Sequence, residues 1–316
     1  MKILLTGYSG FLGAHLVQAL KSDYDLILLG RTKSDSLNCE YVFCDMTPPF
    51  DFQEAVSSCD IVIHMAARVH VMHEQELYPL SVFREINTHA TITLAQQAAL
   101  AGVKRFIFIS SIKVNGDSTT DRKPYTVNDD PVPEDPYGIS KAEAEQGLLD
   151  IAENSGMEVV IIRPPLVYGK GVKANFSSLL NLVSKGLPLP FGCITQNKRS
   201  LVSVSNLVDL IITCIEHPKA GNQVFLVSDD HDVSTSEMVR EMAIALGKPT
   251  WQLPLPIWCY KLIGILFNKS DVVDRLTGSL QVDISYTKDT LGWKPPHTLQ
   301  EGFKQTAQAF LQAKTK

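Results

Sequence analysis

The sequence predicts an α/β fold of the Rossmann type, with a doubly wound parallel sheet and a smaller, mainly helical C-terminal domain. Short apolar runs alternate with helical patterns through residues 1–165, as expected of a parallel sheet covered by helices. Beyond residue 166 this alternation decays, with strand-like returns only near 200–228. We therefore predict two interleaved domains, 1–165 and 166–316.

The chain opens on a strand, a glycine-rich turn and a helix. Residues 2–5 form a short, mainly apolar run, Gly7, Gly10 and Gly13 follow at intervals of three, and residues 12–20 carry a helical apolar stripe. Such a turn lets the backbone approach a pyrophosphate, and the free N–H groups of the helix N-terminus favour the anion. We predict a dinucleotide site here, although the usual spacing is Gly-x-Gly-x-x-Gly.

The end of the second strand, residues 25–29, favours NADP(H) over NAD(H). NAD-binding proteins often carry an acidic residue at this point to hold the ribose 2′-hydroxyl. This chain has Gly30 and Arg31 instead, and an arginine with nearby hydroxyls suits a 2′-phosphate. The alternative is an exposed loop arginine without a ligand. Asp45, after the next short strand, is placed to contact the adenine.

Further apolar runs end in small or polar residues at Ala66, Ser111 and Arg163. In a doubly wound sheet, ligands lie at the carboxyl ends of the strands, so we expect these residues to share one edge. Ala66 and Ala67 are small enough to let a cofactor pass closely. We interpret His64, inside its run, as a packed strand residue rather than a catalyst.

The stretch Asp135–Lys141 is where we place the chemistry. Asp135 suits a helix N-cap and Pro136 the first helical position, so Tyr137 and Lys141 share one face, a turn apart. A free tyrosine has a pKa of about 10, and a nearby ammonium lowers that pKa toward the working pH. The pair is a candidate proton donor and acceptor. The alternative is an ordinary solvated helix face.

Composition excludes several classes of function. A net charge of −5 without a basic run argues against nucleic-acid binding. Six cysteines without a Cys-x-x-Cys pair indicate reduced thiols of a cytoplasmic protein, with no metal site. Because the sequence opens directly on the first strand, we expect no signal peptide. The apolar run 253–267 is too short and interrupted to span a bilayer, so we expect a buried or interface helix. We expect a loop at 167–176 and a helix at 179–186.

In this order, the motifs resemble the extended short-chain dehydrogenase/reductase family, in its NAD(P)-dependent nucleotide-sugar epimerase/dehydratase branch. The resemblance covers essentially the whole chain and is carried by Gly7, Gly10, Gly13, Ala66, Ala67, Ser111, Tyr137, Lys141, Arg163 and Pro164. The runs 110–116, 162–169 and 173–176 look most like bacterial proteins of surface-polysaccharide (O-antigen) synthesis. Those include 4-keto reductases of the UDP-N-acetylquinovosamine type, which are often labelled UDP-glucose 4-epimerase.

The resemblance implies a role for each matching residue. Tyr137 is the implied acid/base, Lys141 binds the nicotinamide ribose and lowers the phenol's pKa, and Ser111 bonds the sugar C4 oxygen. The implied cofactor residues are Gly7, Gly10, Phe11, Gly13, Arg31, Asp45, Ala66, Ala67, Lys141 and Pro164. The implied substrate residues are Asn87, which supports the site, with Ser111, Lys113, Asn175, Arg199 and Arg275. For the two arginines, which suit a diphosphate, surface ion pairs are the alternative.

The resemblance also implies that 1–165 binds the dinucleotide and 166–316 the UDP-sugar, and that the chain is a homodimer through residues 88–100 and 141–152. Dehydratases of the branch carry an Asp-Glu pair directly after the catalytic serine or threonine. Ile112 and Lys113 stand there in this chain, so dehydration is set aside. The leading hypothesis is an NADPH-dependent UDP-4-keto-6-deoxy-N-acetylhexosamine 4-reductase. The alternatives are a UDP-glucose or UDP-N-acetylhexosamine 4-epimerase with tightly bound NAD and, less favoured, a non-catalytic NAD(P)-binding sensor.

Overall fold

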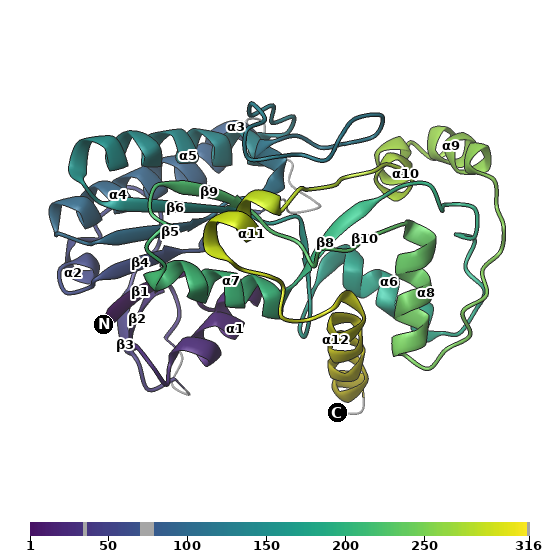
Figure 1. Cartoon of the computed structure of the whole chain (residues 1–316), viewed down its shortest axis with the longest axis horizontal. Helices are drawn as coiled ribbons and strands as arrows, with labels where there is room; N and C mark the ends of the chain where they lie inside the picture. The colour runs from purple at the N-terminus through teal and green to yellow at the C-terminus, as the bar shows by residue number, and fades with distance from the viewer. Residues whose placement is uncertain (34–36, 70–78, 315–316) are drawn as a thin grey trace.

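The structure is a computed structural model that describes residues 1–33, 37–69 and 79–314. Within these residues, a parallel sheet of seven strands forms the centre of the N-terminal half, in the order β3-β2-β1-β4-β5-β6-β9 (Figure 1). The strands are β1 (Lys2–Thr6), β2 (Asp25–Gly30), β3 (Glu40–Phe43), β4 (Ile61–His64), β5 (Arg105–Ile109), β6 (Glu158–Arg163) and β9 (Gln223–Leu226). The predicted fold class is confirmed.

Helices cover both faces of this sheet. Ile3 and Leu5 of β1 pack toward α1 (Phe11–Leu20) and α7 (Val204–Glu216), while Leu4 packs toward the opposite helices. Those are α2 (Gln53–Val56), α4 (Ala90–Leu100) and α5 (Pro136–Ser155), with α3 (Pro79–Phe83) at one end. Successive strand residues point to opposite faces, so a sheet buried on both sides needs the unbroken apolar runs seen in the sequence.

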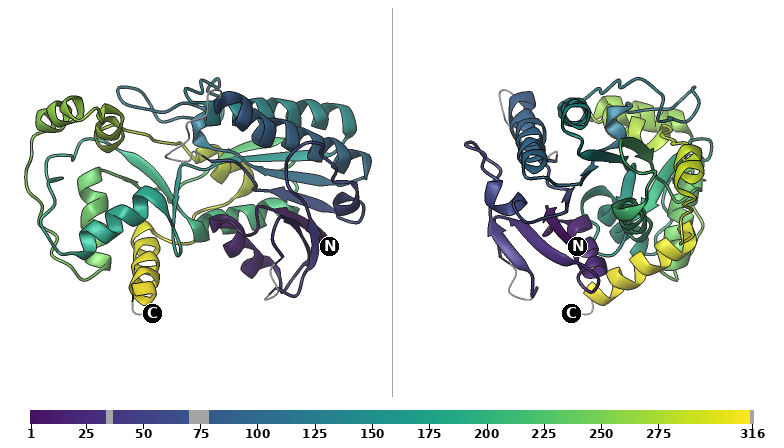
Figure 2. Two further views of the ribbon diagram at one scale, coloured as in Figure 1. Left: turned by 180° about the vertical axis from the view of Figure 1, so that it is seen from behind. Right: turned by 60° about the vertical axis from the view of Figure 1, so that its left-hand side comes forward.

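The C-terminal half has a small sheet in the order β10-β8-β7, formed by β7 (Leu166–Tyr168), β8 (Arg199–Ser203) and β10 (Asp232–Val233). Around it lie α6 (Ala174–Ser184), α8 (Thr235–Ala245), α9 (Ile257–Leu266), α10 (Ser270–Thr277) and α12 (Leu299–Lys314), whereas α11 (Ser285–Leu291) lies beside β9 (Figure 2). Because α7 and β9 rejoin the main sheet, the two halves interleave. The boundary at residue 165 stays a prediction.

The structure differs from the prediction at 167–176 and adds two features that the sequence analysis did not specify. The expected loop at 167–176 contains the end of β7 and the first turn of α6, because Tyr168 is buried in a stack with Phe176 and Phe303. The helix after residue 79 changes to a π-helix at Arg84–His89 before α4 begins. The run 253–267 forms α9, which is mostly exposed. No helix in the described ranges combines the length and apolarity needed to cross a membrane.

Candidate active site

The glycine turn between β1 and α1 is shaped by close backbone contacts. Gly7 has a φ of +70°, and a Cβ there would lie 2.7 Å from the backbone nitrogen of Ala66. A Cβ on Gly13 would lie 2.2 Å from the carbonyl oxygen of Gly7. Gly10 is the N-cap of α1 and provides no side chain to bond the first N–H groups of the helix. These N–H groups and the helix dipole fit the pyrophosphate of a dinucleotide.

Other predicted cofactor residues surround this turn. Phe11 begins α1, Ala66 and Ala67 follow β4 half-buried, and Pro164 is buried at the end of β6. Arg31 and Asp45 are exposed beyond β2 and β3, which are neighbouring strands.

Tyr8 is a residue of this region that sequence reasoning missed. Its ring would lie 3.0 Å from a Cβ added to Gly30, and its hydroxyl donates to the carbonyl of Thr32. Tyr8 therefore connects the glycine turn to the loop that carries Arg31. The position of Tyr8 between the first two glycines of the turn was the sequence signal that could have identified it. Ser34, the second hydroxyl expected near Arg31, lies outside the described residues.

Tyr137 and Ser111 meet across the carboxyl end of the sheet. Helix α5 begins at Pro136, and Asp135 accepts a hydrogen bond from the backbone N–H of Gly138 at 2.6 Å. This cap sets the first turn of the helix, so Tyr137 faces the end of β5. There its hydroxyl is hydrogen-bonded to the side chain of Ser111. A phenol and a serine hydroxyl in contact can share a proton with a third hydroxyl or carbonyl.

The electrostatics of Tyr137 and Lys141 differ from the expectation. Burial, and then the charge of Asp135, raise the pKa of Tyr137 to about 12, although the Ser111 hydrogen bond opposes this. Lys141 does not lower the phenol's pKa here, because its ammonium donates to the carbonyl of Ile109 at 2.9 Å and lies 4.2 Å from the Phe108 ring centroid. Burial lowers the pKa of Lys141 to about 7, and Glu145 opposes that shift.

Asn87 supports the site rather than facing the substrate. It is fully buried in the π-helix, and its side-chain oxygen accepts from the backbone N–H of Arg68 at 2.8 Å. Its amide group donates to the Arg68 carbonyl and to the Ser140 hydroxyl, both at 3.0 Å. Asn87 therefore ties the segment after β4 to the catalytic helix. The substrate contact predicted for Asn87 does not fit, because its amide is occupied by protein partners.

His64 is a packed strand residue, as interpreted from the sequence. Its ring nitrogens form hydrogen bonds with the hydroxyls of Thr6 at 2.7 Å and Thr91 at 2.8 Å. Burial, and then the positive charge of Lys141, lower the pKa of His64 to about 3. The ring is therefore neutral at physiological pH and links β1 to α4.

A buried ion pair fixes the inner face of α5. Arg163, at the end of β6, donates to Glu145 through Nε at 3.0 Å and through Nη2 at 2.5 Å. Its Nη1 donates to Asn115 at 3.0 Å. Sequence reasoning missed Glu145 and Asn115 as site residues. A carboxylate four residues after Lys141, on the same helix face, was the available signal.

Lys113 lies beside the start of the catalytic helix. Its ammonium is 2.5 Å from Asp117 and 3.2 Å from Asp135, the N-cap residue. The backbone N–H of Ile112 donates to the carbonyl of Pro164 at 3.0 Å. The turn after β5 is thereby held against both α5 and β6.

Two arginines from distant segments lie together in the C-terminal half. Arg199 of β8 donates to the backbone carbonyl of Arg275 at 2.8 Å, and Arg275 stands in the last turn of α10. Burial, and then the charge of Arg275, lower the pKa of Arg199. In the ranges described, the guanidinium groups of both arginines donate to backbone carbonyls, which carry no net charge. A phosphate bound here would therefore lie near two positive charges. Asn175 is in the first turn of α6, and its side chain lies outside the described part.

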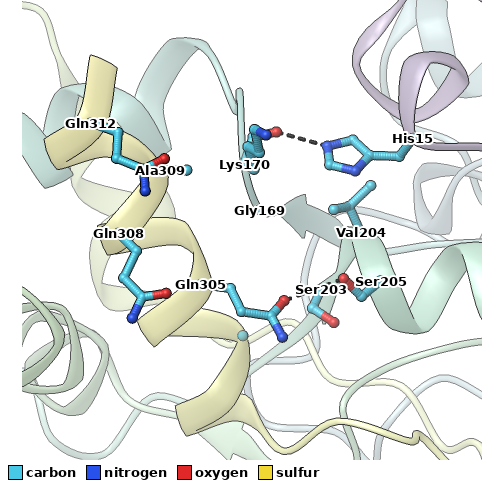
Figure 3. Close-up of a pocket in the computed structure, with 11 residues that line it drawn as sticks. His15, Gly169, Lys170, Ser203, Val204, Ser205, Gln305, Gln308, Ala309 and Gln312 are labelled. Atoms are coloured by element: carbon cyan, nitrogen blue, oxygen red, sulfur yellow. Dashed lines mark hydrogen bonds between the residues drawn. The ribbon is translucent and has the colours of Figure 1, made fainter. Parts of the chain in front are cut away.

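A cavity of about 270 Å³ lies elsewhere, between α1, α12 and the start of α7 (Figure 3). His15 of α1 is hydrogen-bonded to the Lys170 carbonyl at 2.8 Å at its rim. Ser203, Gln305 and Gln308 are among its polar lining residues. None of the predicted site residues lines this cavity, so it is separate from the proposed chemistry.

Sequence comparison with known proteins identifies the family of the chain. A sequence model described as "NAD dependent epimerase/dehydratase family" matches residues 3–228. A protein of Vibrio cholerae named UDP-glucose 4-epimerase is 65% identical over 98% of this chain and 96% of its own length. An Escherichia coli O157:H7 protein named N-acetyl-alpha-D-glucosaminyl-diphospho-ditrans,octacis-undecaprenol 4-epimerase is 27% identical over 99% of this chain and 96% of its own.

Solved structures share the fold. A Thermotoga maritima UDP-glucose 4-epimerase with UDP-glucose has a TM-score of 0.78 at 22% identity, and covers 99% of both chains. A Bacillus cereus UDP-glucuronic acid 4-epimerase in complex with NAD has a TM-score of 0.78 at 20% identity, again over 99% of both chains.

These findings support NAD as the family's cofactor and give no support to the predicted preference for NADP(H). They also do not support the resemblance to 4-reductases of the quinovosamine type, since the 65% identical relative carries the name of an epimerase. The match to the family model and the high identity over nearly the whole chain place this protein, as an enzyme, in the NAD dependent epimerase/dehydratase family.

Proposed function

We propose that this enzyme is a UDP-hexose 4-epimerase that keeps NAD bound between turnovers. The observation that carries the proposal is the 65% identity, over nearly the full length of both chains, to a protein named UDP-glucose 4-epimerase. The contact between Tyr137 and Ser111 at the carboxyl end of the sheet supplies matching chemistry.

In this proposal the glycine turn and the N-terminus of α1 bind the NAD pyrophosphate, and Ala66 leaves room for the dinucleotide. When bound there, NAD would supply the hydride acceptor for oxidation at C4 of the sugar and, once reduced, the hydride donor for the return step. Tyr137 takes the proton of the C4 hydroxyl in the first half and gives it back in the second. Ser111 donates to or accepts from the same C4 oxygen, which keeps that oxygen beside the phenol.

Tyr137 needs a further positive charge to act as a base in this mechanism. With a pKa of about 12, Tyr137 is a poor base while it is buried without such a charge. In the cofactor-free protein Lys141 does not provide that charge, because its ammonium donates to the Ile109 carbonyl. Bound NAD would bring a positively charged nicotinamide ring to the site, and this charge would favour the phenolate.

Arg199 and Arg275 bind the diphosphate of the UDP-sugar in the proposal, because paired guanidinium groups suit phosphate oxygens. Lys113, on the turn after Ser111, lines the sugar end of the site and is oriented by Asp117 and Asp135. We also propose a homodimer through α4 and α5, which pack against each other and form one outer side of the molecule (Figure 1).

One observation favours a second function, the 4-keto-6-deoxy-N-acetylhexosamine reductase. The strand β2 leads into Gly30 and Arg31 without a carboxylate, and Arg31 is exposed where a 2′-phosphate would lie. NADP(H) would then be consumed, rather than kept and recycled.

The test is the cofactor content of the purified enzyme and its activity without added cofactor. Mass spectrometry of the released dinucleotide should identify NAD, and the enzyme alone should interconvert UDP-glucose and UDP-galactose or their N-acetylated forms. The parallel assay uses a UDP-4-keto-6-deoxy-N-acetylhexosamine with NADPH. Stoichiometric NADPH oxidation there, with no interconversion in the first assay, would establish the reductase and refute the epimerase.

A further inference from the structure

An exposed apolar surface lies on α9 and the residue that follows it. We call it the α9 face and define it by Trp258, Leu262, Ile263, Ile265, Leu266 and Phe267. These are six of the twenty large apolar residues that are exposed in the described ranges, and they lie within ten positions of sequence. The exposed fraction reaches 71% for Ile265 and 70% for both Leu266 and Phe267. Contiguous apolar surface of this kind marks an interaction site.

Helix α9 packs on the protein along one narrow line. Only Tyr260 and Gly264 of the helix are buried. Tyr260 stacks on Phe191 with ring centroids 6.5 Å apart, and a Cβ on Gly264 would lie 2.8 Å from the side chain of Val273 in α10. The remaining sides of α9 point away from the protein. The front view (Figure 1) and the view from behind (Figure 2, left) place α9 at the end of the molecule opposite the large sheet.

The charges around the α9 face select the kind of partner. Residues 251–269 include Lys261 and Lys269 but no aspartate or glutamate, and α10, which packs on α9, adds Asp271, Asp274 and Arg275. The two helices together therefore carry one net positive charge in a chain whose net charge is −5. In a symmetric contact with a second copy, Lys261 and Lys269 would have only Asp271 and Asp274 as carboxylate partners from these helices. A partner with negative charge and an apolar interior fits both features.

Tryptophan, phenylalanine, leucine and lysine on one short helix are the side chains that favour the boundary between lipid headgroups and acyl chains. Tryptophan is enriched at that depth, and the stem of a lysine can lie along apolar surface while its ammonium reaches the headgroups. A helix of ten residues is too short to span a bilayer, so at a membrane it would lie in the plane of the interface.

We propose that the α9 face docks on the surface of an anionic phospholipid bilayer. The inference does not depend on the proposed reaction. The next helix, α10, packs on α9 and carries Arg275, whose carbonyl is bonded to Arg199. Docking through α9 therefore turns the arginine side of the molecule toward the membrane and leaves the large sheet away from it.

The test is flotation of the purified full-length enzyme with vesicles of phosphatidylcholine and phosphatidylglycerol at about 3:1, at low salt. The wild-type protein should float with these vesicles. The bound fraction should fall roughly tenfold or more on vesicles without phosphatidylglycerol, because two lysines lose an anionic surface. Raising the salt should weaken binding in the same direction.

The decisive variant is Ile265→Glu combined with Phe267→Glu. It should lower the partition coefficient about tenfold or more, because carboxylates replace two exposed apolar side chains that would enter the bilayer on docking. Ile244→Glu on α8 is the matched control, since Ile244 is 56% exposed but outside the α9 face, and it should float like the wild type. Unchanged circular dichroism and melting temperature identify the variants as folded.

Wild-type protein that stays at the bottom of the gradient would refute the proposal. So would equal loss of binding in the Ile244→Glu control. Sedimentation velocity provides the third readout. If the double variant converts an oligomer to a monomer, the α9 face is a contact between copies and membrane docking is wrong.

Discussion

The two ends of the proposed site are built differently. At the catalytic end, Tyr137, Lys141 and Glu145 share one face of α5, and each is bonded to a residue at the end of β5 or β6. At the substrate end, Arg199 and Arg275 come from β8 and α10 and bond to backbone carbonyls. A buried ionic network permits one geometry, whereas long side chains bonded to carbonyls can adjust. The proposed reaction centre is therefore preorganised, whereas the proposed diphosphate site can adjust to its ligand.

The largest expected effect comes from removing the proton donor. Tyr137→Phe should lower turnover about 10²–10⁴-fold, because it removes general acid–base catalysis. The content of bound dinucleotide should not change. Tyr286→Phe, which removes a hydroxyl on α11, is the control and should keep its activity. Full turnover of Tyr137→Phe on the true substrate would show that the proton passes elsewhere.

Next in size is the ion pair that fixes α5. Arg163→Met should lower the free energy of unfolding by about 3–5 kcal/mol, because it leaves the Glu145 carboxylate buried without its partner. Urea denaturation measures this. Arg84→Met breaks the pair with Glu143 on the outer side of the same helix and should have far less effect. If both variants lost the same free energy of unfolding, the buried inner face of α5 would be no more rigid than its exposed outer face.

The substrate end should respond in affinity rather than turnover. Arg199→Met should raise KM for the UDP-sugar roughly tenfold or more, with kcat nearly unchanged, because charge-assisted hydrogen bonds to the diphosphate are lost. Steady-state kinetics separates the two constants. Arg240→Met on α8 is the matched control. A fall in kcat at constant KM would place Arg199 with the catalytic end.

The smallest effect is a slope of stability against pH in the cofactor-free protein. The pKa of Lys141 is about 7 when folded and about 10.5 when unfolded, so the unfolded chain binds more protons between these values. Stability should therefore rise with pH in this window. Lys141→Met should make the slope less positive by roughly 1 kcal/mol per pH unit. Urea titrations at pH 7 and 9 measure it, with Lys104→Met as the exposed control. Parallel slopes in wild type and Lys141→Met would mean that Lys141 titrates normally.

Local patterns determined much of the catalytic half. Apolar runs bounded by glycine, and Asp135 followed by Pro136, predicted the strands, the dinucleotide turn and the start of α5, all of which the structure contains. These features depend on neighbours within a few residues, since capping, glycine turns and apolar periodicity act over one or two helical turns.

Tertiary structure decided what the side chains do. The sequence suggested that Lys141 acts on the phenol, but the ammonium bonds to the Ile109 carbonyl. The family resemblance implied that Asn87 supports the site among the substrate residues, and the structure uses its amide between Arg68 and Ser140. In both cases a buried polar group takes its partner from a segment far along the chain, because burial without a hydrogen bond is costly.

The sequence by itself determined the parallel sheet, the glycine turn and the spacing of Tyr137 and Lys141. Only the tertiary structure brought Arg199 next to Arg275 and left the apolar residues of α9 exposed, where the sequence predicted a buried or interface helix. The physical reason is the separation along the chain over which each kind of interaction acts. Periodicity and caps are properties of short segments, whereas burial and charge pairing are set by which distant segments pack together.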